Sequence, residues 1–321
     1  MSGLVQATNG DFYGTTVDGG ANGDYGTVFR ITPSGTLTTL YSFCSQTNCT
    51  DGTYPYAGLV QATNGDLYGT TSAGGAYGHG TVFKITQSGT VTTLHSFDGA
   101  DGSDPFAGLI QATNGELYGT TLYGGDAYGT VFEMTASGRL TTLHSFGYAD
   151  GAYPYARLVQ GTDGNFYGTT SWGGANGNYG TAYKIAPSGT LTTLYSFCSQ
   201  SGCTDGEEPD AALVQATNGD FYGTTVSGGA SNWGTVFNLS VGLGPFVETL
   251  PSSGAVGSAV KILGSDLTGA TSVSFDGTAA AFTVVSPSLI TTTVPVGATT
   301  GEVHVVTPSR TLSSNVPFRV P

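Results

Sequence analysis

Short runs of alternating apolar and polar residues, separated by turns that contain glycine, make up most of this chain. The first such runs cover residues 4–7, 11–16, 26–32 and 36–43. Asn9-Gly10 joins the first two runs and Ser34-Gly35 joins the last two, and glycine readily takes the positive φ that tight hairpin turns require. The pattern therefore predicts four antiparallel strands in a unit of about 50 residues, which is one blade of a β-propeller.

The same unit recurs along the chain. Its leading leucine returns at spacings of 55, 50, 49 and 55 residues, as Leu4, Leu59, Leu109, Leu158 and Leu213. Five units predict an all-β fold with a five-bladed β-propeller over residues 1–245. The fifth unit stops after its third run, so residues 246–250 either complete it as a fourth strand or begin the next domain. Alternatively, upstream sequence in the natural chain supplies the fourth strand of the fifth unit.

Connection lengths assign the two ends of each blade. Tight turns join strands one and two and strands three and four, so the long connections share the opposite end, here called the loop face. The connections between blades hold 15 residues after Phe43 and Phe197 but 11 after Phe97 and Phe146. A constant scaffold with one variable face is how repeat folds present a binding surface.

Near residue 245 the composition changes, and Val, Ser and Ala replace the Tyr-Gly-Thr-Thr signature. Short alternating runs follow at residues 259–264, 272–275, 282–285, 290–294 and 302–306. Strands at this spacing are typical of a small immunoglobulin-like β-sandwich, which we expect over residues 246–321.

Composition and charge exclude several classes of protein. Charged residues form only 9% of the 321 residues, and glycine supplies 52, a balance that disfavours helices and nearly excludes an α/β enzyme fold. The net charge of −14 repels nucleic acid and anionic membrane surfaces. No apolar run approaches the roughly 18 residues of a membrane span. We interpret Met1-Ser2 as an expression start on a mature chain, without a signal peptide.

Residues 3–240 closely resemble the Gloeobacter–Verrucomicrobia ("GloVer") tandem repeat of secreted bacterial proteins. The motif that carries this resemblance is Gly-Asp-Phe-Tyr-Gly-Thr-Thr-x-x-Gly-Gly, followed by Gly-Thr-Val-Phe-x-Ile-Thr-x-Ser-Gly-Thr-Leu-Thr-Thr-Leu. Residues 246–321, with Pro251-Ser-Ser-Gly254 and Gly264-Ser-Asp-Leu267, resemble the IPT/TIG module. The resemblance implies a secreted or cell-surface setting and no established activity.

The four cysteines form two pairs of equal spacing. Cys44 and Cys49 lie in one of the long connections between blades, Cys198 and Cys203 lie in the other, and the short connections have none. A zinc site would need two-residue spacing and nearby histidines. We therefore predict two local disulfides, each stabilising by about 2–3 kcal/mol. Disulfides indicate an oxidising, extracellular or periplasmic compartment.

Acidic residues concentrate on the loop face. Such a face attracts cations, so Asp98, Asp101 and Asp104 are candidate Ca²⁺ ligands, although the calcium-loop pattern is incomplete. The alternative is structural, because Asp-Gly pairs recur and aspartate commonly bonds the backbone of its own turn. These pairs begin at Asp51, Asp101, Asp150 and Asp205.

Aromatic residues keep fixed places on the same face while their type varies. Before the Gly-Thr that opens the third strand stand Tyr25, His79, Tyr128, Tyr179 and Trp233. Tyr123 and Trp172 follow the Thr-Thr pair, where other repeats have Asp, Ala or Ser. Flat rings stack on the apolar faces of sugars, and carboxylates such as Glu207, Glu208 and Asp210 accept hydrogen bonds from hydroxyl groups. We therefore expect a neutral-sugar site around Trp172, Tyr179 and Trp233. The alternative is that the rings only pack against the neighbouring blade.

Two further sets have structural interpretations. One tyrosine is identical in every repeat, which predicts a core or interblade role; the five are Tyr13, Tyr68, Tyr118, Tyr167 and Tyr222. His95 and His144 take the strand-four position of Tyr41 and Tyr195, so we expect surface or packing residues rather than catalytic ones.

These patterns favour a non-enzymatic secreted or cell-surface protein that binds a neutral glycan or a surface partner through its loop face, with no cofactor except Ca²⁺. The first alternative is a polysaccharide hydrolase or lyase. Its carboxylate pair would come from Asp24, Asp104, Asp126 or the acids at 207–210. The second alternative is a structural surface repeat without a ligand.

Overall fold

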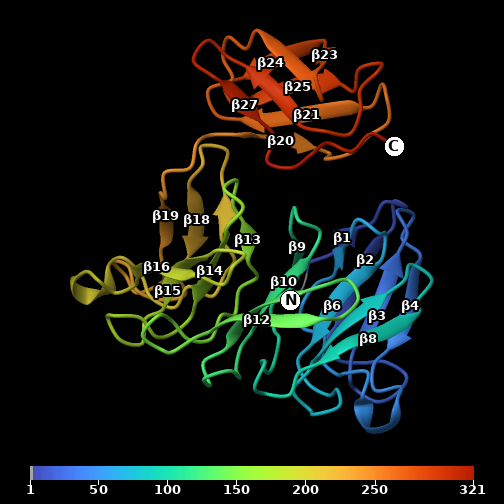
Figure 1. Cartoon of the computed structure of the whole chain (residues 1–321), viewed down its shortest axis with the longest axis vertical. Helices are drawn as coiled ribbons and strands as arrows, with labels where there is room; N and C mark the ends of the chain where they lie inside the picture. Colours follow the sequence, from blue (N-terminus) through green and yellow to red (C-terminus); the bar gives the residue numbers. More distant parts are fainter. Residues whose placement is uncertain (1–2) are drawn as a thin grey trace. The chain divides into compact units, whose positions relative to one another are not determined.

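The computed structural model describes residues 3–321 (Figure 1), so the expected expression start at Met1-Ser2 lies outside the described residues. The chain divides into two compact units. One contains the residues up to Leu213 and Gly223–Phe237, and the other contains Val214–Tyr222 and Asn238–Pro321.

Each of the first four repeats forms one antiparallel sheet of four strands in chain order. The sheet of repeat 1 contains β1 (Val5–Gln6), β2 (Phe12–Thr16), β3 (Thr27–Ile31) and β4 (Leu37–Ser42). The sheet of repeat 2 contains β5 (Val60–Gln61), β6 (Leu67–Thr71), β7 (Thr81–Ile85) and β8 (Val91–Ser96). The sheet of repeat 3 contains β9 (Ile110–Gln111), β10 (Leu117–Thr121), β11 (Thr130–Met134) and β12 (Leu140–Ser145). The sheet of repeat 4 contains β13 (Val159–Gln160), β14 (Phe166–Thr170), β15 (Thr181–Ile185) and β16 (Leu191–Ser196). Repeat 5 has three strands, β17 (Val214–Gln215), β18 (Phe221–Thr224) and β19 (Val236–Leu239).

A pair of threonine hydroxyls closes the loop end of every sheet. In repeat 2, Oγ1 of Thr71 lies 2.8 Å from Oγ1 of Thr81 and also accepts the N–H of Thr81. The preceding residue, Gly80, has a φ of 94°, and a Cβ there would lie 2.4 Å from the carbonyl oxygen of Thr71. Close approach and positive φ both require glycine. The Thr-Thr and Gly-Thr motifs of all five repeats are therefore two sides of one contact.

Successive sheets pack face to face. The forward face of each sheet, which carries the invariant tyrosine, meets the rear face of the next. Tyr68 and Val82 of repeat 2 thus share a core with Leu117 and Phe132 of repeat 3, and equivalent cores join repeats 1 and 2 and repeats 3 and 4. Four of the invariant tyrosines are buried, as their repetition predicts, whereas Tyr222 is 36% exposed.

Repeats 1 and 5 each keep one face open. On the rear face of repeat 1, Leu4 is 56% exposed, whereas the equivalent leucines of repeats 2 to 5 are at most 8% exposed. On the forward face of repeat 5, Val236 is 78% exposed, whereas Val28, Val82 and Val131 are fully buried. In a closed five-bladed ring these two faces would cover each other. The all-β fold of successive antiparallel sheets is confirmed, but the closed five-bladed ring is not.

Both predicted disulfides, Cys44–Cys49 and Cys198–Cys203, are present. Each spans a short 3₁₀ turn, η1 (Thr47–Cys49) or η2 (Ser201–Cys203), and the described residues contain no other helical segment. None of these turns has the length or apolar character to cross a bilayer.

The C-terminal sandwich contains two four-stranded sheets. One has the order β20-β21-β25-β24, formed by Val247–Leu250, Ala259–Gly264, Leu289–Thr293 and Phe282–Ser286. The other has the order β23-β22-β26-β27, formed by Thr278–Ala280, Ser272–Phe275, Val303–Val306 and Thr311–Ser313. Because β20 pairs with β21, residues 247–250 begin the sandwich and do not complete the fifth repeat.

Candidate functional site

Four residues of the connections between repeats have a left-handed backbone directly before a proline. They are Tyr54, Asp104, Tyr153 and Glu208, with φ between 54° and 58°. This conformation costs about 1–2 kcal/mol for a residue with a Cβ, and its recurrence at one position that varies in side chain marks a place to search for function.

Backbone hydrogen bonds on both sides hold this conformation. The N–H of Tyr153 donates to the carbonyl of Tyr128 in the preceding repeat (2.9 Å), and its carbonyl accepts the N–H of Ser171 in the next (3.1 Å). Equivalent pairs of bonds hold Tyr54, Asp104 and Glu208. Because the main chain is fixed without help from the side chain, the side chain is free to vary.

Tyr153 is the centre of an aromatic cluster on the loop face of repeats 3 and 4. Its ring centroid lies 5.2 Å from Tyr123, 5.5 Å from Trp172 and 6.2 Å from Tyr128, and Tyr128 lies 5.1 Å from Tyr148. Tyr123 and Trp172 remain 41% and 44% exposed. The cluster therefore combines rings fixed by edge contacts with ring surface open to solvent.

The predicted aromatic residues divide into two groups. Tyr123, Tyr128 and Trp172 meet in the cluster. Tyr25 contacts Tyr54 at 5.9 Å, and His79 Nδ1 lies 3.0 Å from the Ser103 hydroxyl. Two residues that we expected beside Trp172 are placed differently. Among residues 3–321, no ring contact is found for Tyr179, and Trp233 is 89% exposed without a ring neighbour.

Carboxylates adjoin the cluster. Asp210 accepts a 2.5 Å hydrogen bond from the hydroxyl of Ser171, the residue before Trp172. Burial, together with the charges of Asp210 and Glu207, raises the pKa of Glu208. Burial also raises the pKa of Asp104, against the opposing effects of the Ser103 hydroxyl and His79. The predicted acids thus supply one carboxylate that accepts a hydrogen bond, Asp210, and two carboxyls that hold protons more strongly, Glu208 and Asp104.

The repeated Asp-Gly aspartates are turn residues, as the structural alternative predicts. Asp205 accepts hydrogen bonds from the Tyr195 hydroxyl (2.7 Å) and from the N–H groups of Ser199 and Gln200. Asp101 accepts the N–H of Asp98 at 3.0 Å and pairs with Nε2 of His95 at 2.7 Å.

The same pairing explains both histidines of strand four. His144 pairs with Asp150 at 2.8 Å, as His95 does with Asp101, and each ring packs edge-on against the phenylalanine two residues later. Tyrosine hydroxyls make the corresponding bond in repeats 1 and 4. These histidines therefore hold loops in place.

The predicted calcium ligands have other partners. Asp98 accepts the N–H groups of Ala100 and Asp101, and Asp104 accepts the Ser103 hydroxyl at 3.3 Å. Within the described chain, the three aspartates do not bring three ligand atoms within 4.8 Å of one another. Calcium binding stays a prediction.

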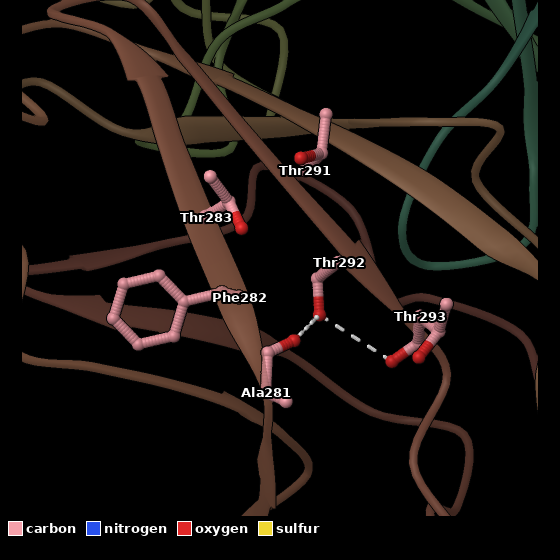
Figure 2. Close-up of a pocket in the computed structure, with 6 residues that line it drawn as sticks. All are labelled: Ala281, Phe282, Thr283, Thr291, Thr292 and Thr293. Atoms are coloured by element: carbon pink, nitrogen blue, oxygen red, sulfur yellow. Dashed lines mark hydrogen bonds between the residues drawn. The ribbon is translucent and has the colours of Figure 1, made fainter.

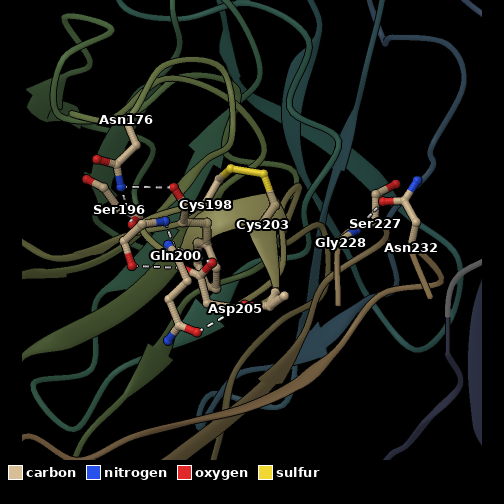
Figure 3. Close-up of a disulfide and its surroundings, with 12 residues drawn as sticks. Asn176, Ser196, Cys198, Gln200, Cys203, Asp205, Ser227, Gly228 and Asn232 are labelled. Carbon is tan, nitrogen blue, oxygen red and sulfur yellow. Dashed lines mark hydrogen bonds between the residues drawn. A yellow bond between two sulfur atoms is a disulfide. The ribbon is translucent and has the colours of Figure 1, made fainter. Parts of the chain in front are cut away.

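The disulfide loop of repeat 4 is held from several sides (Figure 3). Nδ2 of Asn176 donates to the carbonyls of Ser196 and Phe197, at 2.8 and 3.1 Å. Glu207 lies near both sulfurs of Cys198–Cys203, a grouping that resembles a metal site. A disulfide offers no thiolate, however, so these sulfurs are not metal ligands.

The sandwich has its own surface depression, on β24 and β25 (Figure 2). It is lined by Ala281, Phe282, Thr283, Thr291, Thr292 and Thr293. The Thr292 hydroxyl donates to the carbonyl of Ala281 at 2.7 Å. No lining residue carries an acid, a base or a strong nucleophile, so the loop face of the repeats is the stronger candidate site.

Sequence reasoning missed part of the cluster, because Tyr148, Tyr153 and a neighbouring row of rings were not expected. That row follows the prolines: Tyr56 stacks on Phe106 at 4.4 Å, and Phe106 contacts Tyr155 at 6.0 Å. The available signal was the invariant proline with variable neighbours. It reads Tyr54-Pro-Tyr56, Asp104-Pro-Phe106, Tyr153-Pro-Tyr155 and Glu208-Pro-Asp210.

Comparison with solved structures gives distant similarities. An exo-β-1,3-galactanase of Phanerochaete chrysosporium with galactose is 11% identical over 99% of this chain and 89% of its own, with a TM-score of 0.46. A putative exo-β-1,3-galactanase of Bifidobacterium bifidum is 14% identical over 76% and 88%, with a TM-score of 0.43. A putative gluconolactonase is 13% identical over 91% and 87%, with a TM-score of 0.42. At this level of similarity, no activity carries over.

Family models give a firmer result, although a search of curated proteins found no match. The Gloeobacter/Verrucomicrobia repeat model matches residues 1–161 and again 126–261, and the IPT/TIG domain model matches residues 246–320. These matches cover the two parts of the chain whose sheets are described above. The chain therefore belongs to the Gloeobacter/Verrucomicrobia repeat family and carries a C-terminal IPT/TIG domain.

Proposed function

We propose that this protein binds a neutral carbohydrate through the aromatic cluster on the loop face of repeats 3 and 4, in a secreted or cell-surface setting. The observation that carries the proposal is the cluster itself. Exposed faces of Tyr123 and Trp172 are fixed by contacts with Tyr153. Fixed rings lose little conformational entropy when a sugar stacks on them.

Polar groups beside the rings fit the same ligand. Asp210, bonded to Ser171, can accept a hydrogen bond from a sugar hydroxyl, and tyrosine hydroxyls both donate and accept. The repeats are strongly acidic, which opposes phosphate, uronic acid or sulfate groups. A neutral sugar therefore suits the site better than an acidic one.

Binding to insoluble neutral polysaccharides and to a glycan array, with and without Ca²⁺, tests the proposal. Stacking contributes about 1 kcal/mol per ring, so the double variant Tyr123→Ala/Trp172→Ala should bind about 30-fold more weakly. Tyr77→Ala removes a ring that is 65% exposed and lies outside the cluster, so it should bind normally. Salt should change the affinity little, because a neutral ligand releases no counterions.

Two results would contradict the proposal. Absence of binding to every neutral glycan by the parent protein would leave the rings a packing role. Unfolding of the double variant would indicate that these two half-exposed rings stabilise the sheets.

A glycoside hydrolase is the second candidate, favoured by one observation. Burial and the neighbouring acids raise the pKa of Glu208, and a carboxyl that holds its proton more strongly suits a general acid. Release of reducing ends from a polysaccharide panel, abolished by Glu208→Gln, would favour catalysis. Binding without product release would favour the first function.

A further inference from the structure

The open faces of repeats 1 and 5 are the two halves of an interface that occurs repeatedly in this chain. At each internal interface the phenylalanine that follows strand four contacts an aromatic ring on the third strand of the next sheet. The pairs are Phe43–Phe83, Phe97–Phe132, Phe146–Tyr183 and Phe197–Phe237, at 5.1, 5.4, 5.2 and 4.9 Å. The equivalent ring on the rear face of repeat 1 is Phe29, for which residues 3–321 supply no such partner.

A glutamine side chain also forms a hydrogen bond between successive repeats. Oε1 of Gln61 accepts the N–H of Thr8 in the preceding repeat at 2.9 Å, and Gln111 accepts that of Thr63 at 2.8 Å. Gln6 is the equivalent residue of repeat 1. It donates to the carbonyl of Gly10 within its own repeat, but within residues 3–321 no N–H group of another repeat reaches it.

Apolar side chains that are covered elsewhere are exposed on both open faces. Leu4 and Leu37 are 56% and 63% exposed on the rear face of repeat 1. Val226 and Val236 are 54% and 78% exposed on the forward face of repeat 5. Exposed apolar groups gathered on one surface commonly mark a site of protein association.

We propose that these two faces bind each other between copies of this chain, with the forward face of repeat 5 against the rear face of repeat 1 of the next copy. Both faces are exposed within one chain, so they do not cover each other there, and a second copy supplies the complementary face. The contact continues the interface already present between successive repeats. It joins two different surfaces, so the assembly is head-to-tail and can extend beyond two copies.

Sedimentation velocity of the full chain over a range of concentrations tests this proposal. The apparent mass of the parent protein should exceed the 32.5 kDa of one chain and should rise with concentration. Val236→Asp on one face and Leu4→Asp on the other should each weaken self-association at least tenfold. Val296→Asp, at an 86% exposed position of the sandwich, is the control and should assemble as the parent does.

Mixing the two variants tests the head-to-tail geometry. Each retains one intact face, so an equal mixture should form a dimer and nothing larger. A parent protein that stays monomeric at every concentration would overturn the proposal. So would self-association that either variant leaves unchanged, because the contact would then use other surfaces. Matching circular dichroism spectra would verify that the variants are folded.

Discussion

Interior and terminal repeats have nearly the same sequence but different surroundings. In repeats 2 to 4 both faces of the sheet are covered, and every residue of β6, β10 and β14 is buried. In repeat 5, Phe221 is buried on the rear face of β18, while Tyr222 and Thr224 are exposed on the other. Burial in this fold therefore depends on the neighbouring repeat as much as on the residue.

The two disulfides occur only next to the terminal repeats. Cys44–Cys49 lies in the connection from repeat 1 to repeat 2, and Cys198–Cys203 lies in the connection from repeat 4 to repeat 5. The connections between interior repeats have none. A sheet covered on one face gains less from burial, so the cross-links occur where packing contributes least.

The largest expected effect compares equivalent phenylalanines of an interior and a terminal repeat. Phe132→Ala removes a fully buried ring and should lower the free energy of unfolding by about 3–5 kcal/mol. Phe29→Ala removes a half-buried ring and should cost less than half as much. Urea titration measures both, and equal losses would contradict the distinction between the two environments.

Replacing Cys198 and Cys203 by serine should lower the free energy of unfolding by about 2 kcal/mol. Hydrogen exchange should quicken in repeat 5 and remain unchanged in repeat 3. Faster exchange throughout the repeats would instead show that they open as one unit.

A smaller effect of opposite sign is expected at Tyr183. This tyrosine stands where the other repeats have phenylalanine, and its fully buried hydroxyl has no hydrogen-bond partner among the described residues. Tyr183→Phe should stabilise the protein by about 1 kcal/mol, because a buried polar group without a partner is costly. Tyr118→Phe is the matched control: its hydroxyl bonds Asn114 and Glu133, so thermal unfolding should show a loss.

The smallest expected effect is the contribution of Asp205 to the pH dependence of stability. Burial alone would raise the pKa of Asp205, but hydrogen bonds from Tyr195, Ser199 and Gln200 outweigh it and lower the pKa. The stabilisation is therefore complete above the ordinary aspartate pKa of about 4 and is lost as pH falls through the lower folded value. Between pH 6 and pH 3, the free energy of unfolding should fall less steeply for Asp205→Asn than for the parent protein. Parallel pH profiles for the two proteins would contradict this assignment.

Much of the fold could be predicted because the strands and turns of each repeat are determined by residues close together in the sequence. The hairpin turns, the threonine motifs and both disulfides follow from neighbouring residues. Closure of the ring could not be predicted this way, because the packing of Leu4 or Val236 depends on a sheet far along the chain. The fourth strand of repeat 5 was ambiguous because residues 246–250 alternate equally well in either domain.

The site was predicted only in part for a related reason. Tyr123 and Trp172 differ from the other repeats at their position, which the sequence displays directly. Tyr148 and Tyr153 join them through backbone geometry at the connections, whereas Trp233 is 89% exposed and has no ring neighbour among residues 3–321. Variation at one position thus identifies candidates, whereas their convergence requires the three-dimensional arrangement.

The left-handed residue before each proline has a practical consequence. Its main chain is bonded to both neighbouring repeats, and nature already places tyrosine, aspartate or glutamate there. Residues 54, 104, 153 and 208 are therefore suitable positions for a combinatorial library. Glycine and asparagine should be the best tolerated additions, since both adopt positive φ easily. New ligand specificities could then be selected on this scaffold without redesigning its sheets.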